Sequence, residues 1–263
     1  MSESKVIVKQ LTGLTDKLNA SVESLLSKPS EKVVHDLRTT TRRIEASLKL
    51  LPKDLRRSQA ISRYLGHSKS LFKATSQIRD IDIIRVTLRE FETIPEVSDL
   101  LKKNEEKRQH LLIACTRSAR RFQNTKIPKI KTNMISESKL TKRKKKLVKR
   151  LVENLQVQSS VMLANPTLEE LHEFRKNCKM LRYIVEIYLS KKEKRLLVTL
   201  KKLQTLLGSM MDAQATLQFL SQSSSEAIGP IREQVNSARS NIYGKFNSLI
   251  RSRFLSKAPN RSD

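Results

Sequence analysis

A histidine followed by basic residues at helical spacing occurs twice in this chain, each time behind a proline and a hydroxyl residue. The first copy comprises Pro29, Ser30, His35, Arg38 and Arg42, and the second comprises Pro166, Thr167, His172, Arg175 and Lys179. Positions i, i+3 and i+7 share one face of an α-helix. Because like charges on one face repel one another, the two copies indicate sites built for a polyanion.

The basic residues near each histidine define two candidate binding sets, which we name the first and second ladders. The first ladder is His35, Arg38, Arg42, Arg43 and Lys49, and the second is His172, Arg175, Lys176, Lys179 and Arg182. Imidazole, ammonium and guanidinium groups supply N–H donors in a row, and the planar fork of arginine matches phosphate oxygens. The alternative for a single ladder is an ordinary solvated basic face. Two ladders in register behind matched caps favour a functional role.

The charge balance of the chain also favours an anionic partner. Among 263 residues, 53 are Lys or Arg and 26 are Asp or Glu, so the formal net charge is +27. Such an excess is typical of proteins that bind nucleic acid, anionic lipid or a phosphate polymer, and it does not choose among them. Aromatic residues make up only 4% and tryptophan is absent, which disfavours stacking of single-stranded bases.

Apolar periodicity predicts an all-α protein, because it recurs at helical spacing and only 5 Gly and 7 Pro interrupt it. The expected helices cover about 6–26, 30–51, 54–76, 79–91 and 96–122, then 140–163, 167–189, 194–207, 210–220 and 230–255. Thr167 and Glu170 have the spacing of a capping box at the start of one of them.

The second half of the chain repeats the plan of the first. Beyond the ladders, Ser76-x3-Asp80 aligns with Gly208-x3-Asp212. The repeat predicts one domain, 1–263, made of two halves at about 1–125 and 139–256, with a connection at about 126–138. We expect two similar antiparallel helical bundles related by a pseudo-twofold axis, with a central basic pore or cleft.

Three aspartates are candidates for other chemistry. Asp80, Asp82 and Asp212 could bind a metal or act as acid and base. Asp80 and Asp212 fall at expected helix starts, however, where a carboxylate caps the N-terminus, and they could also orient the ladder arginines. We therefore favour a structural role for them.

Other features carry weaker predictions. Cys115 and Cys178 are too few for a disulfide framework and are expected to pack as small apolar groups, whereas His67 and His110 are expected at the surface. A dense basic block, Lys142–Lys146 with Lys149 and Arg150, is as compatible with a solvated face as with a working one.

Familiar catalytic signals are missing from the sequence. It contains no phosphate-binding glycine loop, dinucleotide fingerprint, zinc-protease motif or nucleophile elbow. We therefore expect no catalytic residues, no metal site and no cofactor. Met1–Leu14 lacks the apolar run of a signal peptide, and no stretch approaches the length of a membrane span, so a cytoplasmic location is the default expectation.

The segments 34–51, 76–84, 171–188 and 203–220 together resemble the CHAD family, named for its conserved histidine α-helical domain. The resemblance extends in plan over nearly the whole chain. It implies two four-helix bundles around a central basic pore, with the two ladders facing each other along it, and binding of inorganic polyphosphate. It would also allow association with polyphosphate granules. Ser76 stands where the family often has glycine, and Glu45 where it usually has a basic residue, so the first ladder is expected to bind less strongly than the second.

Three functions follow from these observations, in order of preference. The first is a non-enzymatic module that binds inorganic polyphosphate. The second is a nucleic-acid-binding protein that uses the same basic surface. The third is a metal-dependent polyphosphate-processing enzyme that uses Asp80 and Asp212. A narrow set of converging donors favours a thin phosphate chain, whereas a duplex needs a broad surface.

Overall fold

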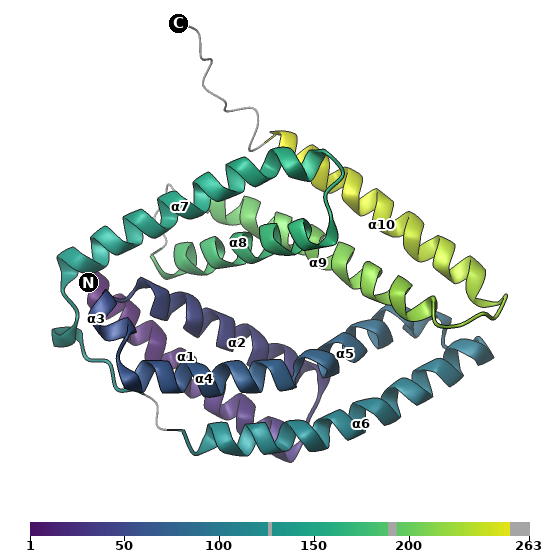
Figure 1. The fold of residues 1–263 in the computed structure, drawn as a ribbon, viewed down its shortest axis with the longest axis horizontal. Helices are drawn as coiled ribbons and strands as arrows, with labels where there is room; N and C mark the ends of the chain where they lie inside the picture. Colours follow the sequence, from purple (N-terminus) through teal and green to yellow (C-terminus); the bar gives the residue numbers. More distant parts are fainter. Residues whose placement is uncertain (126–127, 189–193, 253–263) are drawn as a thin grey trace, which may run out of the picture. The chain divides into compact units, whose positions relative to one another are not determined.

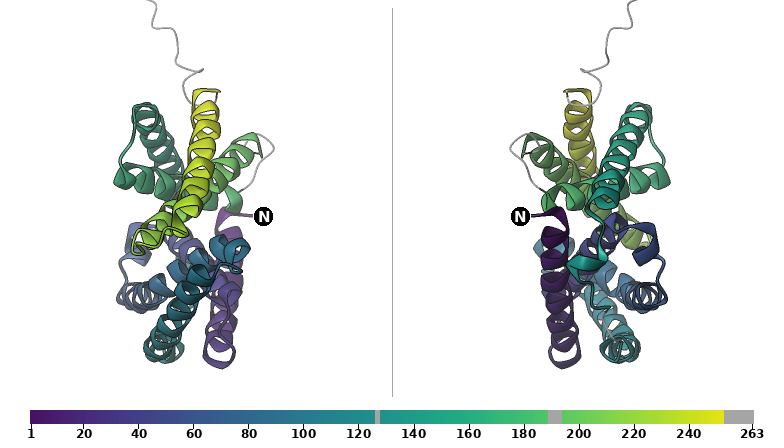
Figure 2. Two further views of the ribbon diagram at one scale, coloured as in Figure 1. Left: turned by 90° about the vertical axis from the view of Figure 1, so that its right-hand side faces the viewer. Right: turned by 90° about the vertical axis from the view of Figure 1, so that its left-hand side faces the viewer.

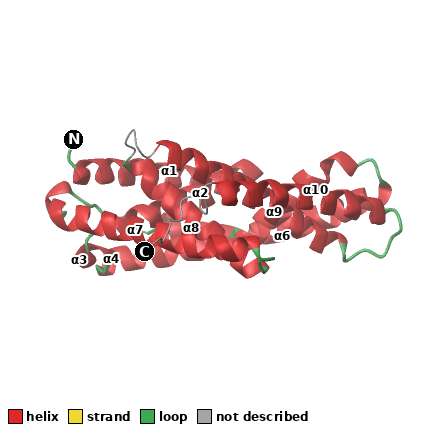
Figure 3. Ribbon diagram, turned by 90° about the horizontal axis from the view of Figure 1, so that it is seen from above, coloured by secondary structure: helices red, strands yellow, loops and turns green. Residues whose placement is uncertain are grey.

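A computed structural model describes residues 1–125, 128–188 and 194–252. Within these ranges the chain consists of helices and loops and contains no strand, which confirms the all-α expectation (Figure 3). The chain divides into two compact units. The N-terminal unit contains residues 1–143 and 223–228, and the C-terminal unit contains 144–222 and the chain from Gly229 onward.

The division between units falls within a helix, between Arg143 and Lys144, and not in the expected connection at 126–138. Of that connection, residues 126 and 127 lie outside the described residues, and the short 3-10 helix η2, Thr132–Met134, belongs to the N-terminal unit. The helix α7, Glu137–Leu163, therefore begins in one unit and continues in the other.

The first ladder lies on α2, one of the helices of the N-terminal unit (Figure 1). Helix α2 packs against α1, α4 and α5, and the long α6 packs against α1, α4 and α5 (Figures 1 and 2). The bounds are α1 Glu3–Ser27, α2 Glu31–Leu50, α3 Lys53–Arg56, α4 Gln59–Ala74, α5 Ser76–Leu88, η1 Arg89–Phe91 and α6 Pro95–Gln123.

The core of this unit is built from the apolar faces that the sequence periodicity predicts. On α2, Val34, Leu37 and Ile44 are almost fully buried, and Ile7 and Leu18 of α1 are completely buried against them. Burying an aliphatic side chain of this size contributes roughly 1.5–3 kcal/mol. The opposite face of α2 keeps the ladder residues at or near the surface.

The helix expected at 54–76 is in fact two helices. The short α3 ends at Arg56, and Ser58 begins α4 by accepting a hydrogen bond from the backbone N–H of Ile61 at 3.4 Å. A serine at this position satisfies an N–H that would otherwise lack a partner at a helix start. Helix α4 then ends at Ala74, and α5 follows with its own axis.

The C-terminal unit consists of α8, Leu168–Ile187, with α9, Lys194–Leu220, α10, Ile228–Ile250, and most of α7. Helices α7 and α8 run antiparallel, because the amide of Asn177 donates to the side-chain oxygen of Gln158 at 3.0 Å while Lys144 lies over Tyr188. The rings of Phe174 and Phe246 meet edge to face at 5.9 Å and join α8 to α10.

A single helix, α9, covers the span where two helices were expected at 194–207 and 210–220. Gly208 lies in the interior of α9. An isolated glycine costs only about 1 kcal/mol in a helix interior, and packing can offset that cost. The expected ends at 189 and 255 lie outside the described residues. None of the helices in the described ranges is long and apolar enough to cross a bilayer.

Candidate anion-binding site

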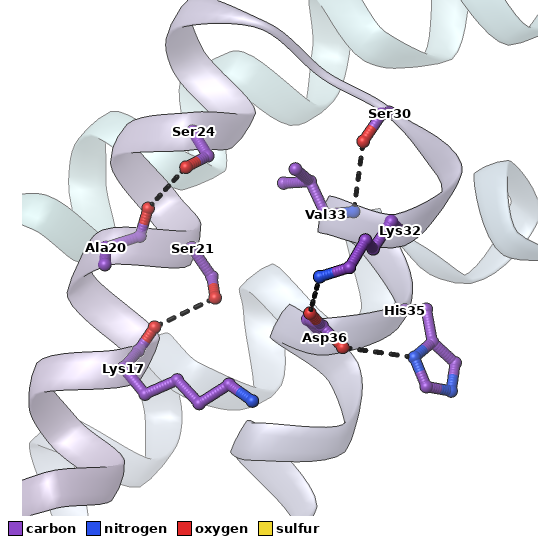
Figure 4. A network of polar contacts seen from close by, with 9 residues as sticks. All are labelled: Lys17, Ala20, Ser21, Ser24, Ser30, Lys32, Val33, His35 and Asp36. Atoms are coloured by element: carbon purple, nitrogen blue, oxygen red, sulfur yellow. Dashed lines mark hydrogen bonds and ion pairs between the residues drawn. The ribbon is translucent and has the colours of Figure 1, made fainter.

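The first ladder starts just after the cap of α2. Ser30 accepts a hydrogen bond from the backbone N–H of Val33 at 3.3 Å, as its position before the helix predicts (Figure 4). His35 follows on the exposed side of the first turns, with 55% of its side chain accessible. The imidazole points away from α1 (Figure 4).

Asp36 fixes the orientation of this histidine. Its Oδ1 lies 3.3 Å from Nδ1 of His35, and its Oδ2 accepts a hydrogen bond from Nζ of Lys32 at 2.9 Å (Figure 4). The Lys32 bond is the largest influence on the pKa of the Asp36 carboxyl, and with the His35 contact it outweighs partial burial and lowers that pKa. An ionised Asp36 favours the tautomer with the proton on Nδ1, which leaves Nε2 toward solvent.

Arg38 is anchored to the junction between α4 and α5. Its Nη1 donates to the carbonyl oxygen of Phe72 at 2.7 Å, to Oγ1 of Thr75 at 3.2 Å and to Oγ of Ser76 at 3.0 Å. The carbonyl of Phe72 belongs to the last turn of α4, where backbone acceptors lose their helical partners. The guanidinium therefore closes a helix end and is held in one orientation.

Phe72 also brings two ladder arginines together. The guanidinium carbon of Arg38 lies 3.9 Å from the ring centroid, and that of Arg42 lies 4.8 Å from it. Each cation–π contact contributes about 0.5–2 kcal/mol, depending on solvent exposure. The ring thus positions two positive charges close to each other.

Asp80 lies in the second turn of α5, not at its start, so the expectation that it caps a helix is wrong. Although the residue is exposed, desolvation of its carboxyl raises the pKa, while the charges of Arg38 and Arg79 act in the opposite direction. The other suggestion for Asp80, that it orients a ladder arginine, agrees with this closeness to Arg38.

The remaining residues of the first ladder are less convergent. Arg43 is half-buried and lies one position beyond the Arg38–Arg42 face, whereas Lys49 is exposed at the end of α2. The carbonyl oxygen of Lys49 accepts a hydrogen bond from Nε of Arg143 at 3.2 Å. This bond ties the start of the basic block on α7 to the end of the ladder helix.

The second ladder follows the predicted capping box. Oγ1 of Thr167 accepts from the backbone N–H of Glu170 at 3.3 Å, and the Glu170 carboxylate accepts from the backbone N–H of Thr167 at 2.7 Å. The latter bond lowers the pKa of Glu170. His172 and Lys176 are exposed on the helix that follows, and Lys176 forms an ion pair with Glu173.

Arg175 lies beside Gly208 of α9, as Arg38 lies beside Ser76 of α5. A Cβ placed on Gly208 would lie 3.7 Å from Nη2 of Arg175, and Gly208 is the residue aligned with Ser76. In each unit the first arginine of the ladder thus reaches the equivalent position of the neighbouring helix. Asp212 lies in the middle of α9, so its expected place at a helix start is wrong.

The end of the second ladder is shielded by an acidic neighbour. Nε of Arg182 lies 3.6 Å from the carboxylate of Glu186, and its guanidinium lies over the ring of Tyr183 at 4.8 Å. Only 18% of the Arg182 side chain is accessible. Lys179 is half-buried one turn earlier, so the accessible part of this ladder is its start.

Three contributors to the site were not among the predicted site residues. Phe72 supports the first ladder, and Lys144 lies 4.5 Å above the ring of Tyr188 beside the end of the second ladder. No spacing signal identifies Phe72, because its role depends on where α4 ends. The basic block contained Lys144, but its aromatic partner lies 44 positions away in the chain.

The other candidate residues are a buried aspartate, two cysteines and two histidines. In the described ranges no group of three His, Cys, Asp or Glu side chains could hold a metal ion. Asp82 is fully buried and bonds to Nε of Arg108 at 2.7 Å. Cys115 and Cys178 are completely buried, as expected, and burial raises the pKa of both thiols, that of Cys115 to about 11. His110 is exposed and His67 is half-buried.

The sequence matches one protein-family model over most of its length. This family model, described as the CHAD domain, matches residues 9–221, which include both ladders and the helices they contact. The chain belongs to the CHAD domain family. The sequence resemblance to that family is therefore confirmed.

The fold agrees with that of a solved CHAD domain. The crystal structure of the CHAD domain from the plant Ricinus communis superposes with a TM-score of 0.70 at 14% sequence identity, covering 96% of this chain and 92% of that one. At this identity the likeness supports the fold and not the ligand. Among curated proteins, none matches this chain.

Proposed function

We propose that this CHAD domain protein binds inorganic polyphosphate through the two ladders, as a non-enzymatic module. Family membership supports the ligand class, since the resemblance to CHAD proteins implies polyphosphate binding. The net charge of +27 supports an anionic partner in general. The proposal extends to a cytoplasmic location and association with polyphosphate granules.

The observation that carries the proposal is the fixed pair of guanidiniums on Phe72. Arg38 is held by three oxygen acceptors, and Arg42 shares the ring with it. Two guanidiniums held in place on one ring offer several N–H donors in fixed positions, and such donors bind phosphate oxygens by charge-assisted hydrogen bonds. Because the side chains are already ordered, a phosphate chain would bind without a large loss of side-chain entropy.

Polyphosphate fits these donors better than a duplex does. It carries about one charge per phosphate unit and is thin and flexible, so successive units can follow donors spaced along one helix face. Its binding should release counterions and weaken steeply with salt, by the physics that governs DNA binding.

Nucleic acid remains the second candidate because of one separate surface. Lys145, Lys146, Lys149 and Arg150 of α7 are all exposed, and they form a basic face outside the ladders. A duplex backbone would use such a face through screened, non-specific contacts. The two candidates therefore depend on different side chains.

A matched pair of variants separates these candidates. The ladder variant replaces Arg38, Arg42, Arg175 and Lys179 by Ala, and the face variant replaces Lys145, Lys146, Lys149 and Arg150 by Ala, so each removes four charges. Titration calorimetry with long-chain polyphosphate, duplex DNA and RNA at two salt concentrations gives the affinities. We expect the ladder variant to lose far more polyphosphate affinity than the face variant. Equal losses of polyphosphate affinity in the two variants would make nucleic acid the preferred candidate ligand.

The non-enzymatic part of the proposal has its own assay. Purified protein should release no phosphate from polyphosphate or nucleoside triphosphates, with or without magnesium or manganese, because the ladders offer donors but no nucleophile with a base. Turnover that disappears in folded Asp80→Ala or Asp212→Ala protein would instead support the processing enzyme.

A further inference from the structure

The C-terminal unit contains a cleft beside the start of α8, which we name the α8–α10 cleft. Its volume is about 490 Å³, and its wall comes from α8, α9, α10 and the loop before α8. All of these elements belong to the same compact unit. None of the described residues that line the cleft belongs to either ladder. A cleft of this size is within the range of small-molecule sites.

Much of the cleft wall is apolar. Leu171 of α8 and Met210 of α9 are buried in it, whereas Leu168 is 51% exposed at its edge. Tyr243 of α10 also lines the cleft, and its hydroxyl is already satisfied because it donates to the carbonyl oxygen of Met162 at 3.0 Å. Such a wall favours a ligand with an apolar body, since binding removes apolar surface from water.

One charged side chain reaches this wall. Among the described residues that line the cleft, Arg239 of α10 alone carries a charge. Its Nη1 donates to the side-chain oxygen of Gln214 on α9, and this bond holds the guanidinium beside the cleft. Nε and Nη2 have no hydrogen-bond partner in the described part of the chain, and neither atom is buried. A molecule in the cleft can therefore reach both N–H groups.

The edge of the cleft is fixed by local structure. Asn165 takes the left-handed conformation, with φ at 61°, which asparagine tolerates better than most residues. Thr167 follows in the capping box, where the carboxylate of Glu170 accepts from its backbone N–H at 2.7 Å and from its hydroxyl at 2.9 Å. These bonds engage the nearby Glu170 carboxylate within α8. The wall is thus ordered before a ligand binds, which lowers the entropy cost of binding.

We infer that the α8–α10 cleft binds a small molecule with an apolar body and one carboxylate, and that Arg239 holds the carboxylate. The Nε–H and Nη2–H of a guanidinium are parallel and match the two oxygens of a carboxylate. One cation balances one negative charge, whereas a phosphate chain would place further charges against the apolar wall. The site is separate from the ladders, and the inference does not rest on polyphosphate binding.

Two probes of one shape test this inference on the full chain. 2-Naphthoic acid is ionised at neutral pH, whereas 2-naphthamide is neutral. Methyl NMR of Leu171, Met210 and Met211 reports binding in the cleft. We expect both probes to shift these resonances and the acid to bind about tenfold more tightly, because hydrogen bonds between two charged groups are stronger than those to a neutral amide. Arg239→Gln should remove this preference for the acid.

Matched variants distinguish the site from bulk charge. Arg232→Gln removes the same charge from α10 at a position outside the cleft wall, so it should keep the wild-type preference for the acid. Leu168→Trp should fill the cleft and abolish binding of both probes, which tests the site even if Arg239→Gln protein folds poorly. The inference is overturned if neither probe shifts the methyl resonances, if wild type binds acid and amide equally, if both arginine variants lose the preference alike, or if binding survives Leu168→Trp.

Discussion

Arg38 combines a structural bond with a place in the binding ladder, and the two roles can be measured separately. Arg38→Ala removes a charged donor from the end of α4, which should lower the free energy of unfolding by about 1.5–3 kcal/mol. Arg63→Ala, an exposed change on α4, should stay within about 0.5 kcal/mol of wild type. Urea denaturation compares them. Equal, small effects would show that the Arg38 bonds contribute little to stability.

Replacing Arg38 by Lys separates charge from geometry at the same position. The charge remains, but a single ammonium cannot reproduce the planar fork or the stacked contact with Phe72. We expect polyphosphate affinity to fall about tenfold or more at constant salt, although the net charge is unchanged. Lys49→Arg serves as the reverse control at an exposed ladder position and should have little effect. If Arg38→Lys protein binds polyphosphate with wild-type affinity, only the charge at this position matters and the geometry of the guanidinium does not.

Asp80 provides a prediction with a defined pH dependence. Its pKa in the folded protein is raised above the usual 3.8, so the ionised carboxylate disfavours folding. That penalty is fully present above the raised pKa and disappears as pH falls toward 3.8. Asp80→Asn should therefore raise stability at pH 7 by less than about 1 kcal/mol, with the gain lost in acid.

The same Asp80→Asn change should tighten polyphosphate binding a few-fold, because it removes a carboxylate beside Arg38. Asp99→Asn is the matched control, since Asp99 is exposed on α6 and pairs with Lys102. Thermal melts from pH 3 to pH 8 and calorimetry at pH 7 give both quantities. A stability gain of Asp80→Asn protein that persists at pH 3 would contradict a raised pKa of Asp80 as the cause of the gain.

At the scale of elements, α5 and α6 are joined by one buried ion pair and one exposed pair. Asp82 and Arg108 are 0% and 6% accessible in their side chains, whereas Arg85 and Glu105 are 53% and 36% accessible. Asp82→Ala leaves a buried guanidinium without its carboxylate and should cost about 3–5 kcal/mol. Arg85→Ala should cost at most about 1 kcal/mol. Denaturant titration distinguishes them, and similar values would mean that Arg108 regains solvent in the variant.

Helix starts were predictable where one local interaction decides them. Ser30 and the Thr167–Glu170 box cap the helices that the sequence assigned to them, because a cap needs only residues within one turn. The break at Ser58 and the continuity of α9 through Gly208 were missed, since each depends on packing against other helices. The ladder residues were predictable from spacing, whereas the Phe72 support was not, because it depends on tertiary structure.

At the scale of the whole molecule, the question is whether the two ladders act on the same phosphate chain. Each ladder belongs to its own compact unit, and the first arginine of each reaches an equivalent position, Ser76 or Gly208. The repeat leads us to propose that the units are related by a pseudo-twofold axis, with His35 equivalent to His172 around a basic pore. A crystal structure with those histidines in unrelated positions would refute it.

Binding stoichiometry tests that proposal in solution. If both ladders contact one chain, the variant Arg38→Ala with Arg42→Ala and the variant Arg175→Ala with Lys179→Ala should each keep one site per protein, with affinity reduced by far more than half. The reason is that a second contact on a bound chain acts at high effective concentration, and losing it removes the whole advantage. With a polyphosphate long enough to reach both ladders, calorimetry should show one site in wild type and in both variants. If the ladders are independent, wild type should instead bind at two sites, and each double variant should retain one of them at wild-type affinity.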